Sequence, residues 1–151
     1  MAKSPAAPLA EAAQRPDGGL AHLPGYALRR ASAAMMAELA SRLAPLDLRI
    51  ADATVLLLIA GRANMTSSDI GRIIDIQRAN MVPLLARMEA AGLVRRVPLD
   101  RKSQAIVLTD AGQSRHAQVE AITGQFEDDL MARIPEEHRP HLLPALHALY
   151  A

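Results

Sequence analysis

The chain has 151 residues, of which 50% are hydrophobic and only 2% aromatic, with a formal net charge of +1 and no cysteine. This length suits a single domain with a sizeable core, and the aliphatic composition favours packed helices over a β-sandwich. The lack of cysteine excludes disulfides, thiolate redox switches and cysteine-built zinc sites. No run is long and apolar enough to span a bilayer, and no apolar signal core follows Lys3, so we expect a cytoplasmic protein with no membrane partner.

The N-terminal segment, residues 1–22, is rich in alanine and proline and shows no sustained period, which predicts a disordered tail. We expect a single domain over residues 23–151. It starts with a long helix at about 24–44, which Pro45 ends. A second helix, at about 52–61, is apolar on nearly every side and should therefore be central and buried.

The next part of the chain predicts a helix-turn-helix. Thr66 begins a helix with Asp69 three residues on, so the hydroxyl and the carboxylate can cap free amides reciprocally. Another helix follows after a few residues, at about 78–91, and Gly92 is suited to end it in the left-handed conformation. The apolar edge of this second helix consists of Met81, Leu84, Leu85 and Met88.

The two helices are followed by a hairpin pattern. Residues 93–97 and 104–108 are β-branched and aliphatic around a polar bend, which predicts a wing and completes a winged helix-turn-helix at about 50–109. Thr109 then caps a helix whose apolar stripe is long enough to need a partner, and a last helix is expected at about 136–150. The predicted fold class is therefore mainly α with a small β-wing.

Basic residues gather on the helix-turn-helix and wing, as is needed to neutralise phosphates. Only Glu89 and Asp100 are acidic in this region, while other acidic residues concentrate at 127–129 and 136–137. An isolated basic cluster is more often a solvated face, but here it coincides with a nucleic-acid motif. The basic residues are Arg78, Arg87, Arg95, Arg96, Arg101 and Lys102.

The apolar edge of the second helix leaves the opposite residues free to face a DNA groove. Asn80 could read an adenine edge or make a local hydrogen bond near the helix start, and Arg78 suits guanine or phosphate. Ala79 or Pro83 could touch a thymine methyl group, and Arg87 suits a phosphate. The candidate DNA contacts are Ser67, Ser68, Gln77, Arg78, Ala79, Asn80, Pro83, Arg87, Arg95, Arg96, Arg101 and Lys102.

The order of these parts, over about residues 23–149, resembles the MarR family of winged helix-turn-helix transcription factors. The most specific pieces are 88–96 (Met-Glu-Ala-Ala-Gly-Leu-Val-Arg-Arg), 100–102 (Asp-Arg-Lys) and 107–112 (Val-Leu-Thr-Asp-Ala-Gly). The resemblance implies a cytoplasmic homodimer whose terminal helices, about 24–44 and 110–151, intertwine. Such a dimer would bind double-stranded DNA at a pseudo-palindrome with half-sites about one helical turn apart.

The resemblance also implies roles for the wing. In the family an aspartate at the position of Asp100 braces the wing by pairing with a basic residue, here Arg101 or Lys102. The wing is shorter than is common in the family, so we assign more of the base reading to residues 78–87. Residues 95–102 are expected chiefly to anchor the DNA backbone.

Many members of the family are repressors released by a small aromatic carboxylate, a phenolic ligand or an acyl-thioester. By this resemblance the candidate pocket residues are Tyr26, Arg29, Arg30, Ser32, Ala33, Leu57 and His116. An arginine there would suit a carboxylate or phosphate. The stronger alternative is that Arg29 and Arg30 are solvated or pair across the dimer.

Two other function classes compete with this interpretation. An enzyme is disfavoured because His138 and His141, in a His-x-x-His spacing, have Pro140 between them and no carboxylate in a familiar zinc pattern. We therefore expect no metal, no cofactor and no catalytic residue. The second alternative is a winged-helix module that binds proteins, which the fold alone does not exclude. A redox signal could act only through methionine or a cofactor.

Overall fold

The computed structural model describes residues 19–150. The tail expected over residues 1–22 therefore lies almost wholly outside the described residues, and within its last part Leu20–His22 form a short 3-10 helix, η1. The chain divides after Glu38 into two compact units. Helix α2 (Pro24–Leu43) begins in the first unit and ends in the second, within one residue of the bounds expected from the sequence.

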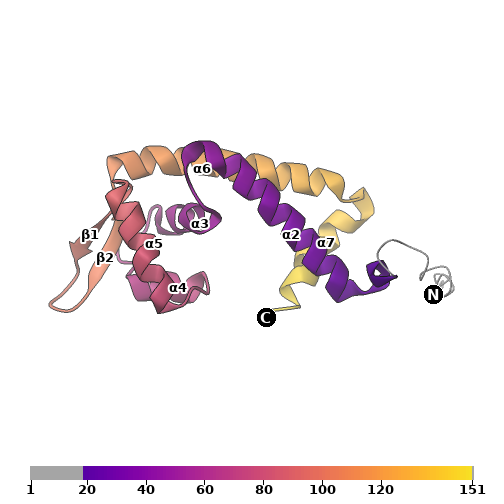
Figure 1. Ribbon diagram of the computed structural model, residues 1–151, viewed down its shortest axis with the longest axis horizontal. Helices are drawn as coiled ribbons and strands as arrows, with labels where there is room; N and C mark the ends of the chain where they lie inside the picture. The colour runs from indigo at the N-terminus through magenta and orange to yellow at the C-terminus, as the bar shows by residue number, and fades with distance from the viewer. Residues whose placement is uncertain (1–18, 151) are drawn as a thin grey trace. The chain divides into compact units, whose positions relative to one another are not determined.

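The second unit is mainly helical with one two-stranded sheet (Figure 1). After α2 the chain turns through η2 (Ala44–Leu46), where Pro45 and the left-handed Asp47 (φ 54°) redirect the backbone. The remaining elements are α3 (Ile50–Ile59), α4 (Ser67–Ile73), α5 (Arg78–Ala90), β1 (Val94–Pro98), β2 (Gln104–Leu108), α6 (Asp110–Arg133), η3 (Glu136–His138) and α7 (Arg139–His147). The predicted fold class, mainly α with a β-wing, is confirmed.

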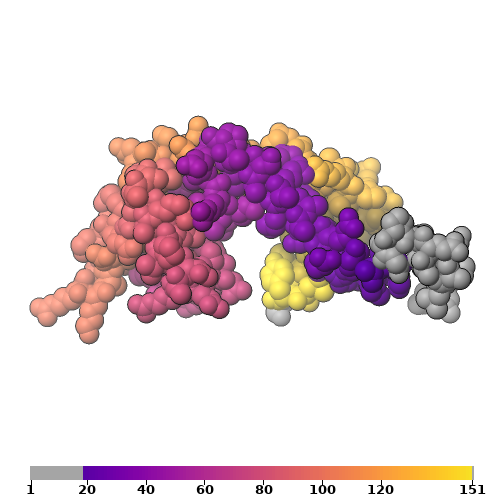
Figure 2. Space-filling view, in the orientation of Figure 1, coloured from indigo at the N-terminus to yellow at the C-terminus, as the bar shows by residue number. Residues whose placement is uncertain are grey.

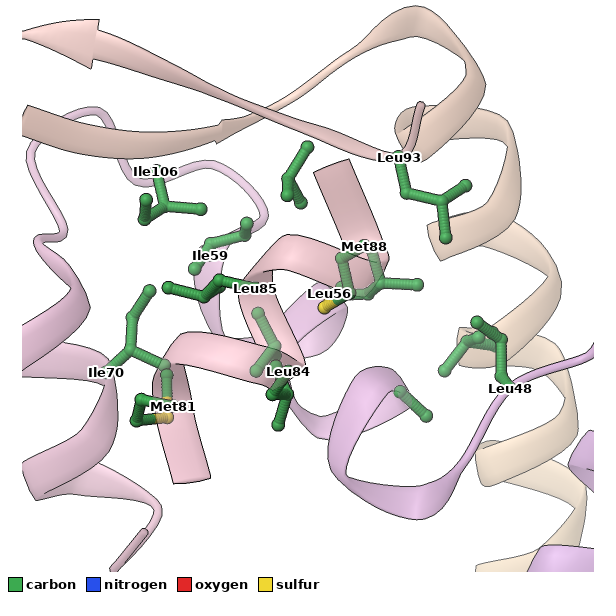
Figure 3. Packing of buried hydrophobic residues seen from close by; sticks show 14 of the residues in the cluster. Leu48, Leu56, Ile59, Ile70, Met81, Leu84, Leu85, Met88, Leu93 and Ile106 are labelled. Carbon is green, nitrogen blue, oxygen red and sulfur yellow. The ribbon is translucent and has the colours of Figure 1, made fainter. Parts of the chain in front are cut away.

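Helix α3 lies at the centre of the core, as its apolar composition predicts. Val55, Leu56 and Ile59 are buried on it and pack with side chains from α4, α5 and β2 (Figure 3). From α5 the four residues of the predicted apolar edge are all buried, namely Met81, Leu84, Leu85 and Met88. The core thus fixes which face of α5 is left to solvent.

The wing is an antiparallel hairpin tied to the start of α4. Strand β1 pairs with β2 from Val94 opposite Leu108 to Pro98 opposite Gln104. Thr66, the residue that caps α4, forms a bridge to Ala105, and the amide of Ile106 donates to the carbonyl of Met65 at 2.8 Å. The hairpin is therefore attached to the helix-turn-helix through the backbone.

A second junction joins the end of α5 to the start of α6. Gly92, at φ 69°, ends α5 in the left-handed conformation predicted for it. The Thr109 hydroxyl donates to the carbonyl of Gly92 at 2.5 Å and accepts from the amide of Gly112 at 3.0 Å, which caps α6. Gly112 lies so close to the backbone of Leu93 that an added Cβ would be 1.9 Å from its carbonyl oxygen.

Helix α6 is long, with 24 residues, and its later part contacts the last turns of α2. Arg42 pairs with Asp129 at 2.7 Å, and its guanidinium lies 5.5 Å from the centre of the Phe126 ring. Among the helices formed by residues 19–150, none combines the length and the apolar character that a membrane span needs.

Candidate nucleic-acid interface

Helix α4 begins with the reciprocal cap predicted from the sequence. The Thr66 hydroxyl accepts from the amide of Asp69 at 3.2 Å, and the Asp69 carboxylate accepts from the Thr66 amide at 3.1 Å and from its hydroxyl at 2.6 Å. These hydrogen bonds, first that from the Thr66 hydroxyl and then that from its amide, lower the pKa of Asp69. The exposed Ser68 and half-buried Ser67 follow directly in the first turn.

The turn between α4 and α5 is short and closely packed. Asp75 adopts a left-handed conformation (φ 53°), and the amide of Ile76 donates to the carbonyl of Gly71 at 2.8 Å. A Cβ at Gly71 would lie 2.9 Å from the carbonyl oxygen of Ile76, so this position needs glycine. The close packing fixes the direction in which α5 leaves the turn.

Helix α5 presents the start of its outer face to solvent (Figure 2). Arg78, Ala79, Asn80 and Pro83 are all exposed, and the exposed Gln77 precedes the helix. Within the described residues no hydrogen bond engages the Asn80 side chain, since only its backbone amide bonds to the carbonyl of Gln77, at 2.9 Å. The helix runs unbroken through Pro83 to Ala90.

Arg87 has a partner that the sequence did not reveal. Its guanidinium is ion-paired with the carboxylate of Asp52 on α3, a side chain that is only 3% exposed. The other carboxylate oxygen of Asp52 accepts from the amide of Arg49 at 2.9 Å and so caps α3. Arg87 therefore has a structural partner inside the fold, although its side chain remains 38% exposed, and the phosphate contact expected of it stays a prediction.

Arg96 is also engaged within the protein. Its guanidinium donates to the Glu89 carboxylate at 2.8 and 3.3 Å, which links β1 to the last turn of α5. This pair braces the wing against α5, a role that was expected of Asp100. Both side chains remain partly exposed, so solvent screens the pair and its net stabilising effect is modest.

Asp100 organises the wing tip, but not through a basic side chain as expected. Its carboxylate accepts from the amides of Lys102 and Ser103 at 2.7 and 2.8 Å and from the Ser103 hydroxyl at 2.5 Å. These bonds, that from the Ser103 hydroxyl above all, lower the pKa of Asp100. The carboxylate closes a local turn, and the exposed Arg101 and Lys102 are left with no ion pair among the described residues.

The predicted DNA contacts from three separate segments come together. A groove between the start of α4 and the wing is lined by Ser67, Ser68, Arg78, Arg96, Arg101 and Lys102, among others. Arg95 lies on β1 with an exposed side chain. The free amides at the start of α4 and the guanidinium of Arg78 thus face the same groove as the basic wing tip, which suits a polyanion.

The candidate ligand residues divide between the two units. Tyr26, Arg29 and Arg30 form a cluster on α2, with the two guanidinium carbons 5.1 and 5.9 Å from the centre of the Tyr26 ring. Ser32 and Ala33 are exposed on the same helix. In the second unit, Leu57 on α3 and His116 on α6 are half-buried. Between residues 19 and 150, no three His, Cys, Asp or Glu side chains gather as metal ligands would.

Two features of the site were missed from the sequence. The apolar pattern predicts a buried helix from about residue 52 but not the role of Asp52, although an acidic residue in the first turn of such a helix is itself a signal for capping. Val82 on α5 was not considered, yet it is 60% exposed. Its place opposite the buried edge follows from helical spacing, so the pattern could have identified it.

Comparisons with known proteins place part or most of the chain in one family. A model of the MarR family matches residues 46–103. The repressor CouR, in a structure with a 23-mer DNA duplex, is 30% identical, with 91% of this chain and 99% of that chain covered and a TM-score of 0.83. CouR bound to p-coumaroyl-CoA is 29% identical, with 87% and 94% covered and a TM-score of 0.77.

A curated relative gives a further match. It is a candidate transcriptional regulatory protein for the hcr operon of Thauera aromatica, 26% identical over 98 residues. That alignment covers 64% of this chain, and the chain spans about three fifths, 59%, of the relative.

Proposed function

Because the chain belongs to the MarR family of transcriptional regulators, we propose that it is a repressor that binds a pseudo-palindromic operator as a homodimer and is released by a small aromatic acid or its thioester. The observation that supports DNA binding most directly is the groove between α4 and the wing. It unites Ser67 and Ser68 at a helix start with the cations of Arg78, Arg101 and Lys102.

The basic residues of the lobe have different proposed roles. Arg78 and Asn80, both exposed at the start of α5, are assigned to base edges in the major groove. Arg95, Arg101 and Lys102 are assigned to the DNA backbone. Arg87 and Arg96 hold the lobe in shape through their ion pairs and position the other contacts.

Exposed apolar side chains in both units support a homodimer. Leu28 and Met36 on α2 are exposed, as are Leu143 on α7 and Leu149 and Tyr150 just beyond it. Side chains of this size are normally covered, and self-association is the way in which a two-fold dimer covers them. Sedimentation at increasing protein concentration tests this, and Leu149→Asp should lower the dimer fraction.

An acyl-thioester is the ligand class that we favour. CouR, the relative with 29% identity over most of both chains, was solved with p-coumaroyl-CoA. In this chain the cluster of Tyr26, Arg29 and Arg30 combines an aromatic ring with two cations, which suits a ligand that has both an aromatic part and anionic groups. Release from DNA would follow if the ligand favours dimers whose lobes cannot span both half-sites.

The DNA assignment is tested by measuring affinity for a duplex from the region flanking the protein's own gene and for a random duplex at several salt concentrations. A steep linear fall of log affinity with log salt concentration is expected, because phosphate binding releases counterions. Binding that does not respond to salt, or no binding to either duplex, would support a protein-interaction module instead.

The ligand assignment needs a separate measurement on the DNA complex. We expect p-coumaroyl-CoA to dissociate the complex, with free p-coumarate and acetyl-CoA as matched controls for its two halves. Arg29→Gln should weaken this response, whereas Arg62→Gln, an exposed arginine in the other unit, should leave it unchanged. Dissociation by none of the three compounds would contradict the ligand class while leaving DNA binding intact.

A further inference from the structure

The outer face of α5 is apolar along its whole length. Ala79, Val82, Pro83, Ala86 and Ala90 share one side of the helix, because 82 and 83 both lie three or four residues from 79 and from 86, and 90 lies four residues beyond 86. All five are exposed, and they lie opposite the edge that α5 buries in the core. None has a side chain that donates or accepts a hydrogen bond.

Polar groups that could read bases are confined to the borders of this face. Arg78 and Asn80 flank its beginning and are exposed. Arg87, farther along the helix, is ion-paired with Asp52, and Glu89 is paired with Arg96. Beyond the first turn, the outer face of α5 therefore presents only methyl and methylene groups to a DNA groove.

Val82 is the largest side chain that this face exposes, at 60%. It lines a groove together with Ser67, Ser68 and Arg78, which are also among the assigned DNA contacts. An exposed β-branched residue in the middle of a helix has neither high helix propensity nor burial to favour it. Its position is explained if it is buried only when a partner is bound.

The charge around this face identifies the partner. Arg72, Arg78 and Arg96 line the groove that Val82 also lines, and Arg78 in addition lines the groove with Arg101 and Lys102 of the wing. An occupant that suits this face is therefore polyanionic at its edges and apolar at its centre. The major groove of DNA meets both conditions where thymine is present, because the C5-methyl group of thymine is the apolar group on that edge of the base pairs.

We propose that the chain selects its operator through the C5-methyl groups of pyrimidines, with Val82 as the principal reader and Ala79 and Pro83 beside it. This inference rests on the DNA-binding function proposed above and narrows its specificity. The sites chosen should contain thymine at one or two fixed positions in each half-site. Any base with a C5-methyl group should satisfy the contact, 5-methylcytosine included.

The test begins with duplexes selected by the wild-type protein from a random pool. Each thymine of a half-site is then replaced singly by deoxyuridine, which removes the methyl group and leaves the hydrogen-bonding edge intact. We expect roughly a fourfold loss of affinity at one or two positions, the effect of one buried methyl group. Where cytosine replaces such a thymine, methylation of the cytosine C5 should raise the affinity about fourfold.

A double-mutant cycle assigns the contact to Val82. The substitution Val82→Ala should weaken binding to the thymine duplex. The variant protein should then bind the thymine and uracil duplexes with equal affinity. Because Val82 is exposed, the variant should fold, which a thermal melt verifies. Ile73→Ala is the matched control, since Ile73 on α4 is 51% exposed and lies outside this face, and its thymine-to-uracil ratio should equal that of the wild type.

The outcomes separate this inference from the proposed function. Wild-type protein that selects no duplex contradicts DNA binding itself. Tight binding with no response to any uracil substitution overturns methyl reading but leaves the repressor proposal standing. Equal losses for Val82→Ala on thymine and uracil duplexes would likewise overturn it, because Val82 would then act elsewhere.

Discussion

Arg87 of helix α5 is ion-paired with Asp52, which lies in the first turn of the buried helix α3. The two residues come from segments 35 positions apart in the sequence, and the Asp52 carboxylate also caps α3 through the amide of Arg49. One buried carboxylate thus sets the position of α5 against the core. The contact therefore helps to orient the face of α5 that we propose to bind DNA.

Arg87→Ala should destabilise the protein by about 3 kcal/mol, because it leaves the Asp52 carboxylate buried without a counter-charge. Asp52→Asn should cost less, since Arg87 is 38% exposed and can turn toward water. Urea unfolding followed by circular dichroism measures both. Arg72→Ala, which breaks an exposed pair with Asp69, is the control and should change little. A larger loss of stability for Asp52→Asn than for Arg87→Ala would contradict this role of Arg87.

Gly112→Ala and Gly124→Ala, both in α6, should have opposite effects. A Cβ at Gly112 would lie 1.9 Å from the Leu93 carbonyl oxygen, whereas nothing lies within 4 Å of one at Gly124. Gly112→Ala should therefore cost about 3 kcal/mol or more. Gly124→Ala should stabilise the helix by about 0.5 to 1 kcal/mol. Thermal unfolding compares them, and similar melting temperatures would rule out the close packing at Leu93.

Arg101→Ala and Asn80→Ala should affect DNA binding in different ways. Arg101 at the wing tip is assigned to the backbone, so its loss should weaken binding to all duplexes and reduce the salt slope by about one. Asn80→Ala should relax sequence choice with little effect on the random duplex. Fluorescence anisotropy on specific and random duplexes distinguishes them. Equal losses on both duplexes for both variants would refute this division.

The wing tip should lose its order in acid. The pKa of Asp100 lies below its ordinary value of 3.8 because the Ser103 hydroxyl and the amides of Lys102 and Ser103 donate to its carboxylate. A depressed pKa means that the carboxylate stabilises the turn above pH 3.8, and that this contribution disappears as the pH falls through the lower folded value. The amide shifts of Lys102 and Ser103 in NMR should report that midpoint. A midpoint at or above 3.8 would contradict the hydrogen bonds, and Asp100→Asn should remove the transition.

The starts of α4 and α6 and the end of α5 could be predicted because their signals are local. The last helix, expected at about 136–150, is instead divided into η3 and α7. Thr66, Gly92 and Thr109 each act on amides or carbonyls within a few residues, so the cap or stop is visible in the sequence alone. The buried edge of α5 follows from spacing in the same way. The order of these parts then indicated the family resemblance.

The partners of charged residues could not be predicted, because they depend on how distant elements pack. Nothing in the sequence near Arg87 indicates that Asp52 lies beside it, and the same holds for Arg96 and Glu89. For Asp100 the expected partner was the side chain of Arg101 or Lys102, whereas its carboxylate accepts from the neighbouring amides of Lys102 and Ser103. Two of the basic residues that looked available for DNA therefore have structural roles.

The hydroxyl of Thr109 connects helix α5 to helix α6. It joins the carbonyl of Gly92, at the end of α5, to the first turn of α6 through two hydrogen bonds. The end of α5 and the start of α6 are therefore coupled through one side chain. A rotation of α6 should therefore move α5 as well, and this is how the proposed ligand, bound away from α5, would displace the residues proposed to contact DNA.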